Sequence, residues 1–180
     1  TILSRHYNET GRHEEAALHA EKACEHGKAR LEPSLQRVEA YYHLGRFEEG
    51  FVVLDRTRWP LERKSLLLLW KARYCAQLGR PADAEAFWRE CNGLVENPAY
   101  LAAFAEFLAA QDRWPEAAEW VDRALLRDPN EQTALRLRAE IRMARLPLRR
   151  AGDAAPATAH AIQSAMRWST ALIKRAMGKA

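Results

Sequence analysis

The chain has 180 residues, with 29% charged and 48% hydrophobic side chains. This balance excludes a disordered charged tail, and purely apolar runs such as Leu66 to Trp70 are too short to cross a bilayer. Three cysteines cannot close a disulfide framework, so the composition favours a helical protein of a reducing compartment.

The first residues indicate that the chain continues a longer protein. Thr1 is not an initiator methionine, and the pattern that follows is typical of the middle of a helix, not of its capped start. We therefore expect upstream domains or targeting signals to precede it. Free cysteines favour the cytoplasm, and a signal peptide upstream would leave the periplasm open.

A short motif recurs at a fixed interval along the chain. Gly11, Gly45 and Gly79 are each 34 residues apart, and each is followed by Arg, then an acidic residue three positions after the Arg. A fourth copy, in which Asp112 replaces the glycine, comes 33 residues after the third. Such a period is the signature of a helical repeat.

Each motif joins two helical patterns. Apolar residues recur at intervals of three and four on both sides of the glycine, and glycine permits the left-handed backbone that ends a helix. A small residue follows each motif and lets paired helices approach closely: Ala16, Gly50, Ala84 and Ala117. The sequence therefore predicts repeated antiparallel helix pairs.

The helices expected from these patterns follow one another with short turns. They span residues 1–9, 12–26, 33–44, 47–57, 63–78, 81–93, 98–111, 114–127, 131–146 and 157–177. Residues 147–156, which contain proline and glycine, form a predicted linker before a basic amphipathic helix over 157–180.

This organisation resembles the tetratricopeptide-repeat family, whose repeat is about 34 residues long. The best match runs from Pro98 to Pro129, and its packing positions are Leu101, Phe104, Ala105, Leu108, Trp114, Ala117, Trp120 and Ala124. Gly50 departs from the alanine usual at its place. The resemblance covers residues 1–146 as about four repeats, the first one truncated. It implies an all-α, right-handed superhelical solenoid of antiparallel helix pairs with a C-terminal capping helix.

The final helix leaves other roles open. Its basic, amphipathic character suits a membrane surface, and it could also serve self-association into an oligomer. Residues 147–180 carry six basic side chains and one acidic one, so the remaining body is close to neutral. A nucleic-acid protein concentrates basic residues on its working face, so this distribution argues against nucleic acid.

The sequence shows no motif for chemistry. Its six histidines and three cysteines lack metal-ligand spacing, and it contains no phosphate loop or nucleophile elbow. We therefore predict that the chain is not an enzyme and needs no cofactor and no metal. The three cysteines are expected to be small buried hydrophobes.

The family resemblance implies that the first helix of each pair lines a concave groove. The residues that it places there are Gln36, Glu39, Tyr42, His43, Leu66, Leu69, Trp70, Arg73, Ala103 and Glu106. Tyr42 and Trp70 would anchor a bound peptide or helix, while Arg73 and Glu106 would set its register. The Lys, Asn and Arg clamp of chaperone-binding members is missing from the matching places.

The leading hypothesis is a protein-interaction module that binds a peptide or helix of another protein. It would belong to a larger bacterial protein or assembly, such as envelope-polysaccharide or secretion machinery. Two alternatives remain: a non-catalytic arm of an enzyme, for example a glycosyltransferase with its catalytic domain upstream, or a self-associating structural element.

Overall fold

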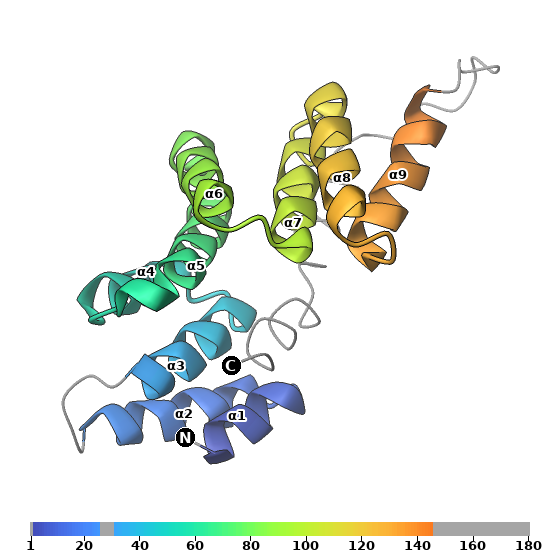
Figure 1. Ribbon diagram of the computed structural model, residues 1–180. Coiled ribbons are helices and arrows are strands. Elements are labelled where there is room, and N and C mark those ends of the chain that lie inside the picture. Colours follow the sequence, from blue (N-terminus) through green and yellow to red (C-terminus); the bar gives the residue numbers. More distant parts are fainter. Residues whose placement is uncertain (1, 26–30, 146–180) are drawn as a thin grey trace. The chain divides into compact units, whose positions relative to one another are not determined.

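The computed structural model describes residues 2–25 and 31–145, and every regular element there is a helix (Figure 1). The chain divides into two compact units, Thr1–Leu94 and Val95–Ala180, and each is described by itself. The predicted linker over 147–156 and the predicted capping helix over 157–180 lie outside the described residues.

The first unit consists of consecutive helix pairs. Its elements are α1 (Ile2–Glu9), α2 (His13–Glu25), α3 (Leu31–His43), α4 (Phe47–Arg56), the 3₁₀ turn η1 (Leu61–Arg63), α5 (Lys64–Gln77) and α6 (Pro81–Leu94). α1 packs on α2, α3 on α4 and α5 on α6, while α2 contacts α3 and α4 contacts α5. The predicted helix pairs are confirmed; α1, α3 and α5 are called first helices below.

The second unit contains α7 (Pro98–Ala109), α8 (Trp114–Arg127) and α9 (Gln132–Arg145), with α7 as the first helix of its pair. Each of the three contacts the other two. Asn97 caps α7 because its side chain accepts a hydrogen bond of 2.9 Å from the Ala99 amide, and Pro98 occupies the first turn, where no amide donor is needed.

The four motif copies adopt the same turn. Gly11, Gly45 and Gly79 have φ of 77°, 73° and 69°, and Asp112 has φ of 59° in the equivalent place. In every copy the arginine forms an ion pair with the acidic residue three positions later, at the start of the second helix. The turn thus explains why glycine, arginine and an acid recur together.

Asp112→Gly should stabilise the second unit by about 0.5 kcal/mol, because glycine adopts a positive φ without the steric cost of a Cβ. Asp112 is the one described residue other than glycine with a positive φ. The midpoint of urea unfolding would measure the gain. The mirror variant Gly79→Asp should lose about 1 kcal/mol for the same steric reason. No atom lies within 4 Å of a Cβ added at Gly79, so backbone strain alone accounts for the expected loss of stability. A lower midpoint for Asp112→Gly would contradict the expectation.

The small residues after each turn are buried where helices meet. Ala16, Ala84 and Ala117 are all 0% exposed, as close packing of a helix pair requires. Gly50 has a specific cause in the structure: a Cβ at this position would overlap the phenol ring of Tyr74. Glycine in place of the usual alanine at position 50 therefore leaves room for Tyr74.

The described α-helices begin and end within two residues of the predicted boundaries, and two of the differences have a structural cause. α3 begins at Leu31, two residues before the predicted start at Pro33, because a proline in the first helical turn lacks only an amide that needs no partner there. The 3₁₀ turn η1 precedes α5 and was not predicted. Trp59 closes the preceding junction by donating a hydrogen bond of 3.0 Å from Nε1 to the Leu54 carbonyl.

Candidate functional site

The residues predicted to line a groove all lie on first helices, and most of them are buried. α3 carries Gln36, Glu39, Tyr42 and His43; α5 carries Leu66, Leu69, Trp70 and Arg73; α7 of the second unit carries Ala103 and Glu106. Of the ten, His43 is half-buried and the others are at most 8% exposed. Their role in binding stays a prediction.

The structure brings Tyr42, Trp70 and Arg73 together in the first unit. The ring centres of Tyr42 and Trp70 are 5.8 Å apart in an edge-on arrangement. The Arg73 guanidinium carbon lies 4.6 Å from the Tyr42 ring centre and 5.1 Å from that of Trp70. Since Arg73 is only 3% exposed, its cation is largely shielded from water between two aromatic faces, where such contacts are strongest. We call these three residues the aromatic–arginine cluster.

Tyr74 holds this cluster against the neighbouring helices. Its side chain is fully buried, and its Oη donates a hydrogen bond of 2.6 Å to the carbonyl of Val38 in α3. Burial raises the pKa of the Tyr74 phenol, so the hydroxyl remains a donor. Tyr74 also contacts the Tyr42 ring, with the centres 5.5 Å apart. α3 and α5 are therefore joined by both polar and aromatic contacts.

A pair of histidines lies at the edge of the cluster. The rings of His13 and His43 are stacked, with centres 4.3 Å apart and planes inclined by 13°. His13 Nδ1 lies 3.3 Å from the Asn8 side-chain oxygen, and the buried Nε2 of His43 has no hydrogen-bond partner among the described residues. Burial, with His13 and Arg73 nearby, lowers the pKa of His43 to about 4, and burial lowers the pKa of His13 as well.

Acid should therefore destabilise the first unit through His43. Its pKa falls from the ordinary 6.5 to about 4 on folding, so the unfolded chain binds more protons between these values and stability drops as pH falls through that window. After allowance for solvent screening, we expect a loss of about 1 kcal/mol at pH 5 relative to pH 7.

The measurement is the difference in urea midpoint between wild type and His43→Phe at the two pH values. The variant should lose less stability on acidification. The control His6→Gln, at an exposed histidine of α1, should follow wild type. Equal losses in wild type and His43→Phe would contradict this expectation.

Other predicted groove residues make separate contacts. Gln36 lies against α1, where Asn8 donates to its carbonyl at 2.9 Å and to its side-chain oxygen at 3.2 Å. In the second unit, Glu106 forms an ion pair with Arg136 of α9. Glu106 is thus engaged within its own unit, which is a structural contact that the sequence did not predict.

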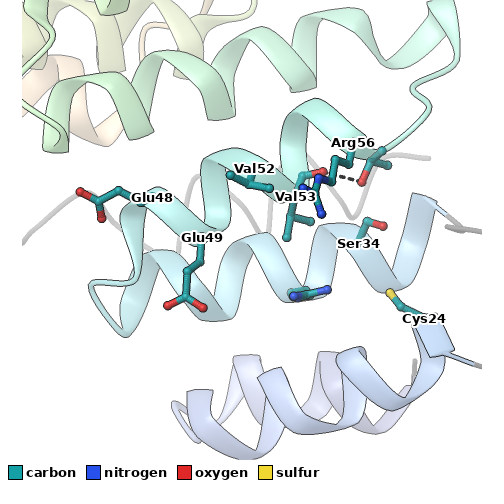
Figure 2. A pocket seen from close by; sticks show the side chains of 9 residues that line it. Cys24, Ser34, Glu48, Glu49, Val52, Val53 and Arg56 are labelled. Atoms are coloured by element: carbon teal, nitrogen blue, oxygen red, sulfur yellow. Dashed lines mark hydrogen bonds between the residues drawn. The ribbon is translucent and has the colours of Figure 1, made fainter.

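A pocket of about 370 Å³ opens between α2, α3 and α4, and was missed by the sequence analysis (Figure 2). Its lining residues are Cys24, Ser34, Arg37, Glu48, Glu49, Val52, Val53, Arg56 and Thr57. Val52 is 45% exposed at the edge of this pocket. The available signal was the spacing of Glu48, Val52 and Arg56, which places them on one helix face.

The cysteines differ in their environments. Cys75 and Cys91 are fully buried as predicted, whereas Cys24 is half-buried and lines the pocket, contrary to the expectation for all three. The Cys91 thiol lies 3.2 Å from the Ser65 carbonyl, and burial raises its pKa to about 12. Neither buried thiol has the thiolate character that a nucleophile needs.

The described part of the chain has neither a metal-binding cluster nor a helix suited to span a membrane. Among residues 2–25 and 31–145, no group of three or more His, Cys, Asp or Glu is placed to hold a metal ion. Over those same ranges, each helix falls short of the length and apolar character that a membrane span requires.

Comparison with known proteins identifies the repeat. The tetratricopeptide-repeat family model matches residues 65–90 and 98–123, which cover most of α5 with α6 and of α7 with α8. These two helix pairs match the tetratricopeptide repeat. The family resemblance seen in the sequence is thereby confirmed.

A solved structure shares the tetratricopeptide-repeat fold. It is the crystal structure of a thermophilic tetratricopeptide-repeat protein of Thermus thermophilus, with a TM-score of 0.67 and 24% identity over 79% of this chain and 77% of that one. No curated protein matches the sequence. Tetratricopeptide repeats typically act as non-catalytic scaffolds, so these findings support a protein–protein interaction module.

Proposed function

We propose that the chain binds a peptide or helix of a partner protein on its first helices, with the aromatic–arginine cluster of α3 and α5 at the centre. By analogy of composition, we extend the proposal to a larger bacterial protein or assembly, of the envelope-polysaccharide or secretion type. Binding would rest on shape and apolar complementarity, with charged side chains fixing register.

The observation that carries this function is the set of polar side chains buried on first helices. They are Ser4, Asn8, Ser34, Gln36, Glu39, Arg73 and Glu106, each at most 7% exposed. Burying charged and polar groups costs free energy, and apolar residues of similar volume often stabilise a fold at least as well. The other buried polar residues of the described chain are Thr57, Asn92 of α6 and Glu131, so most of these groups lie on first helices, where they are better suited to specific recognition than to stability.

The aromatic–arginine cluster would supply the anchor of such a site. Tyr42 and Trp70 are 8% and 1% exposed, and residues of these types together with arginine dominate binding energy in protein interfaces. Glu39 in α3 is one turn from Tyr42 and 7% exposed. It would pair with a basic residue of the bound segment.

A displayed peptide library selected against the chain would test this function. A selected peptide should shift the amide resonances of α3 and α5 more than those of α2 and α4. Glu39→Gln, which keeps the side-chain shape, should weaken that peptide by at least about fivefold because a charged hydrogen bond is lost.

The matched control is Glu131→Gln, a buried glutamate just before α9 that is 5% exposed and outside the proposed site. It should leave the affinity unchanged. Shifts confined to α2 and α4, or failure to enrich any peptide, would contradict binding on the first helices.

A further inference from the structure

The pocket of Figure 2 presents a charge pattern that is complementary to itself. Glu48, Val52 and Arg56 follow one another along α4 at intervals of four residues, and all three line the pocket. A helix rises 1.5 Å per residue, so the acidic and basic ends of this stripe are about 12 Å apart with the valine midway. We call these residues the α4 stripe.

The charges at the two ends are available to a partner. Neither Glu48 nor Arg56 forms an ion pair or side-chain hydrogen bond within the described residues, and both are exposed. Their neighbours in the pocket are already engaged, since Glu49 pairs with Arg46 and the Arg37 Nε donates to the Tyr41 hydroxyl at 2.9 Å. Among the charged residues that line the pocket, the unmatched ones are thus Glu48 and Arg56 of the stripe.

We propose that the α4 stripe is the interface of a symmetric dimer in which α4 packs antiparallel to α4 of a second copy. A two-fold axis that passes between the two Val52 residues would set Glu48 of each copy against Arg56 of the other. Val52 of each copy would fill the apolar part of the other's pocket beside Val53. The dimer is separate from the peptide site proposed on the first helices.

The self-complementary order of the stripe favours a second copy over an unrelated partner. In a two-fold interface, if one residue contacts a second residue of the other copy, the reciprocal contact also forms, so an acid and a base equally far from a central apolar residue satisfy one another twice. An exposed valine above an apolar hollow also gains by burial, at about 25 cal/mol per Å². Because a single helix pair forms a small interface, the dimer is expected to be weak.

Sedimentation equilibrium of the whole chain tests the dimer, at low salt and from about 10 μM to about 1 mM, where weak association is measurable. The mass of wild type should rise from 20.6 kDa toward twice that value. Glu48→Arg and Arg56→Glu should each raise the dissociation constant at least about tenfold, because each change removes two ion pairs and creates two repulsions. Circular dichroism would verify folding of these surface variants.

Charge exchange provides the decisive comparison. The double variant Glu48→Arg with Arg56→Glu should restore association to within about threefold of wild type, since the reversed pairs are again complementary. An equimolar mixture of the two single variants should also associate. In contrast, Glu62→Arg, the same charge change at an exposed residue outside the pocket, should leave association unchanged.

Three results would overturn the dimer through α4. The first is a wild-type mass that stays at 20.6 kDa over the whole range. The second is equal weakening by Glu48→Arg and Glu62→Arg, which would reduce the effect to net charge. The third is failure of the double variant to associate, which would show that the stripe binds a different protein, whose own charges do not change with the variant.

Discussion

Gly50→Ala is expected to destabilise the first unit by about 2 kcal/mol, although alanine is the better helix former. The Cβ of the new residue would overlap the ring of Tyr74. Tyr74 cannot easily move, because it is 0% exposed and its hydroxyl is bonded to the Val38 carbonyl. Forcing extra atoms into such packing typically costs about 1–3 kcal/mol, more than the helix propensity of alanine returns. Urea unfolding followed by circular dichroism would measure the loss.

Gly93→Ala is the matched control. Gly93 is also helical, in α6, but is exposed and has no atom within 4 Å of an added Cβ. Its replacement should therefore stabilise by up to about 1 kcal/mol. In a Tyr74→Ala background, Gly50→Ala should cease to be destabilising, since the overlapping ring is gone. A gain from Gly50→Ala in the wild-type background would show that Tyr74 is not the obstacle.

The helix pairs and their turns could be predicted because their causes are local. The turn at Asp112 was recognised as equivalent to the three glycine turns from the residues around it, and its positive φ agrees. The predicted span 114–127 coincides with α8, whose start carries a proline in the first turn. Periodicity and turn chemistry both act over a few residues, so the sequence records them directly.

Contacts between distant residues could not be predicted in the same way. Gly50 and Tyr74 are far apart in the chain, as are the stacked His13 and His43, and neither pairing leaves a local pattern. The burial of Trp70 at 1% exposure also depends on its surroundings in the folded chain. The family resemblance placed this residue on a first helix, but only the packing decides how much of it water reaches.

Trp70→Ala is expected to cost the first unit about 3–5 kcal/mol, the usual loss for truncating a buried aromatic side chain to alanine. The indole is 1% exposed and contacts both Tyr42 and Tyr74, with ring centres 5.8 Å and 6.2 Å away. Removing it leaves a cavity and takes one of two aromatic faces from the buried Arg73 cation. A loss of this size is a large share of the stability of an ordinary domain, so partial unfolding at physiological temperature should be visible by circular dichroism.

Trp59→Ala serves as the comparison, because this indole is only half-buried and its described hydrogen bond is the one to the Leu54 carbonyl. Its loss should cost about 1–1.5 kcal/mol. If Trp70→Ala instead unfolds at the wild-type urea concentration, the expectation that Trp70 stabilises the packing of the first unit is wrong. A stable Trp70→Ala chain that no longer binds a selected peptide would then make the indole a binding anchor. If the Trp70→Ala chain is unstable, the peptide should be tested against Trp70→Phe instead. This variant keeps an aromatic neighbour for Tyr42 and Arg73, so it separates an effect on binding from an effect on folding.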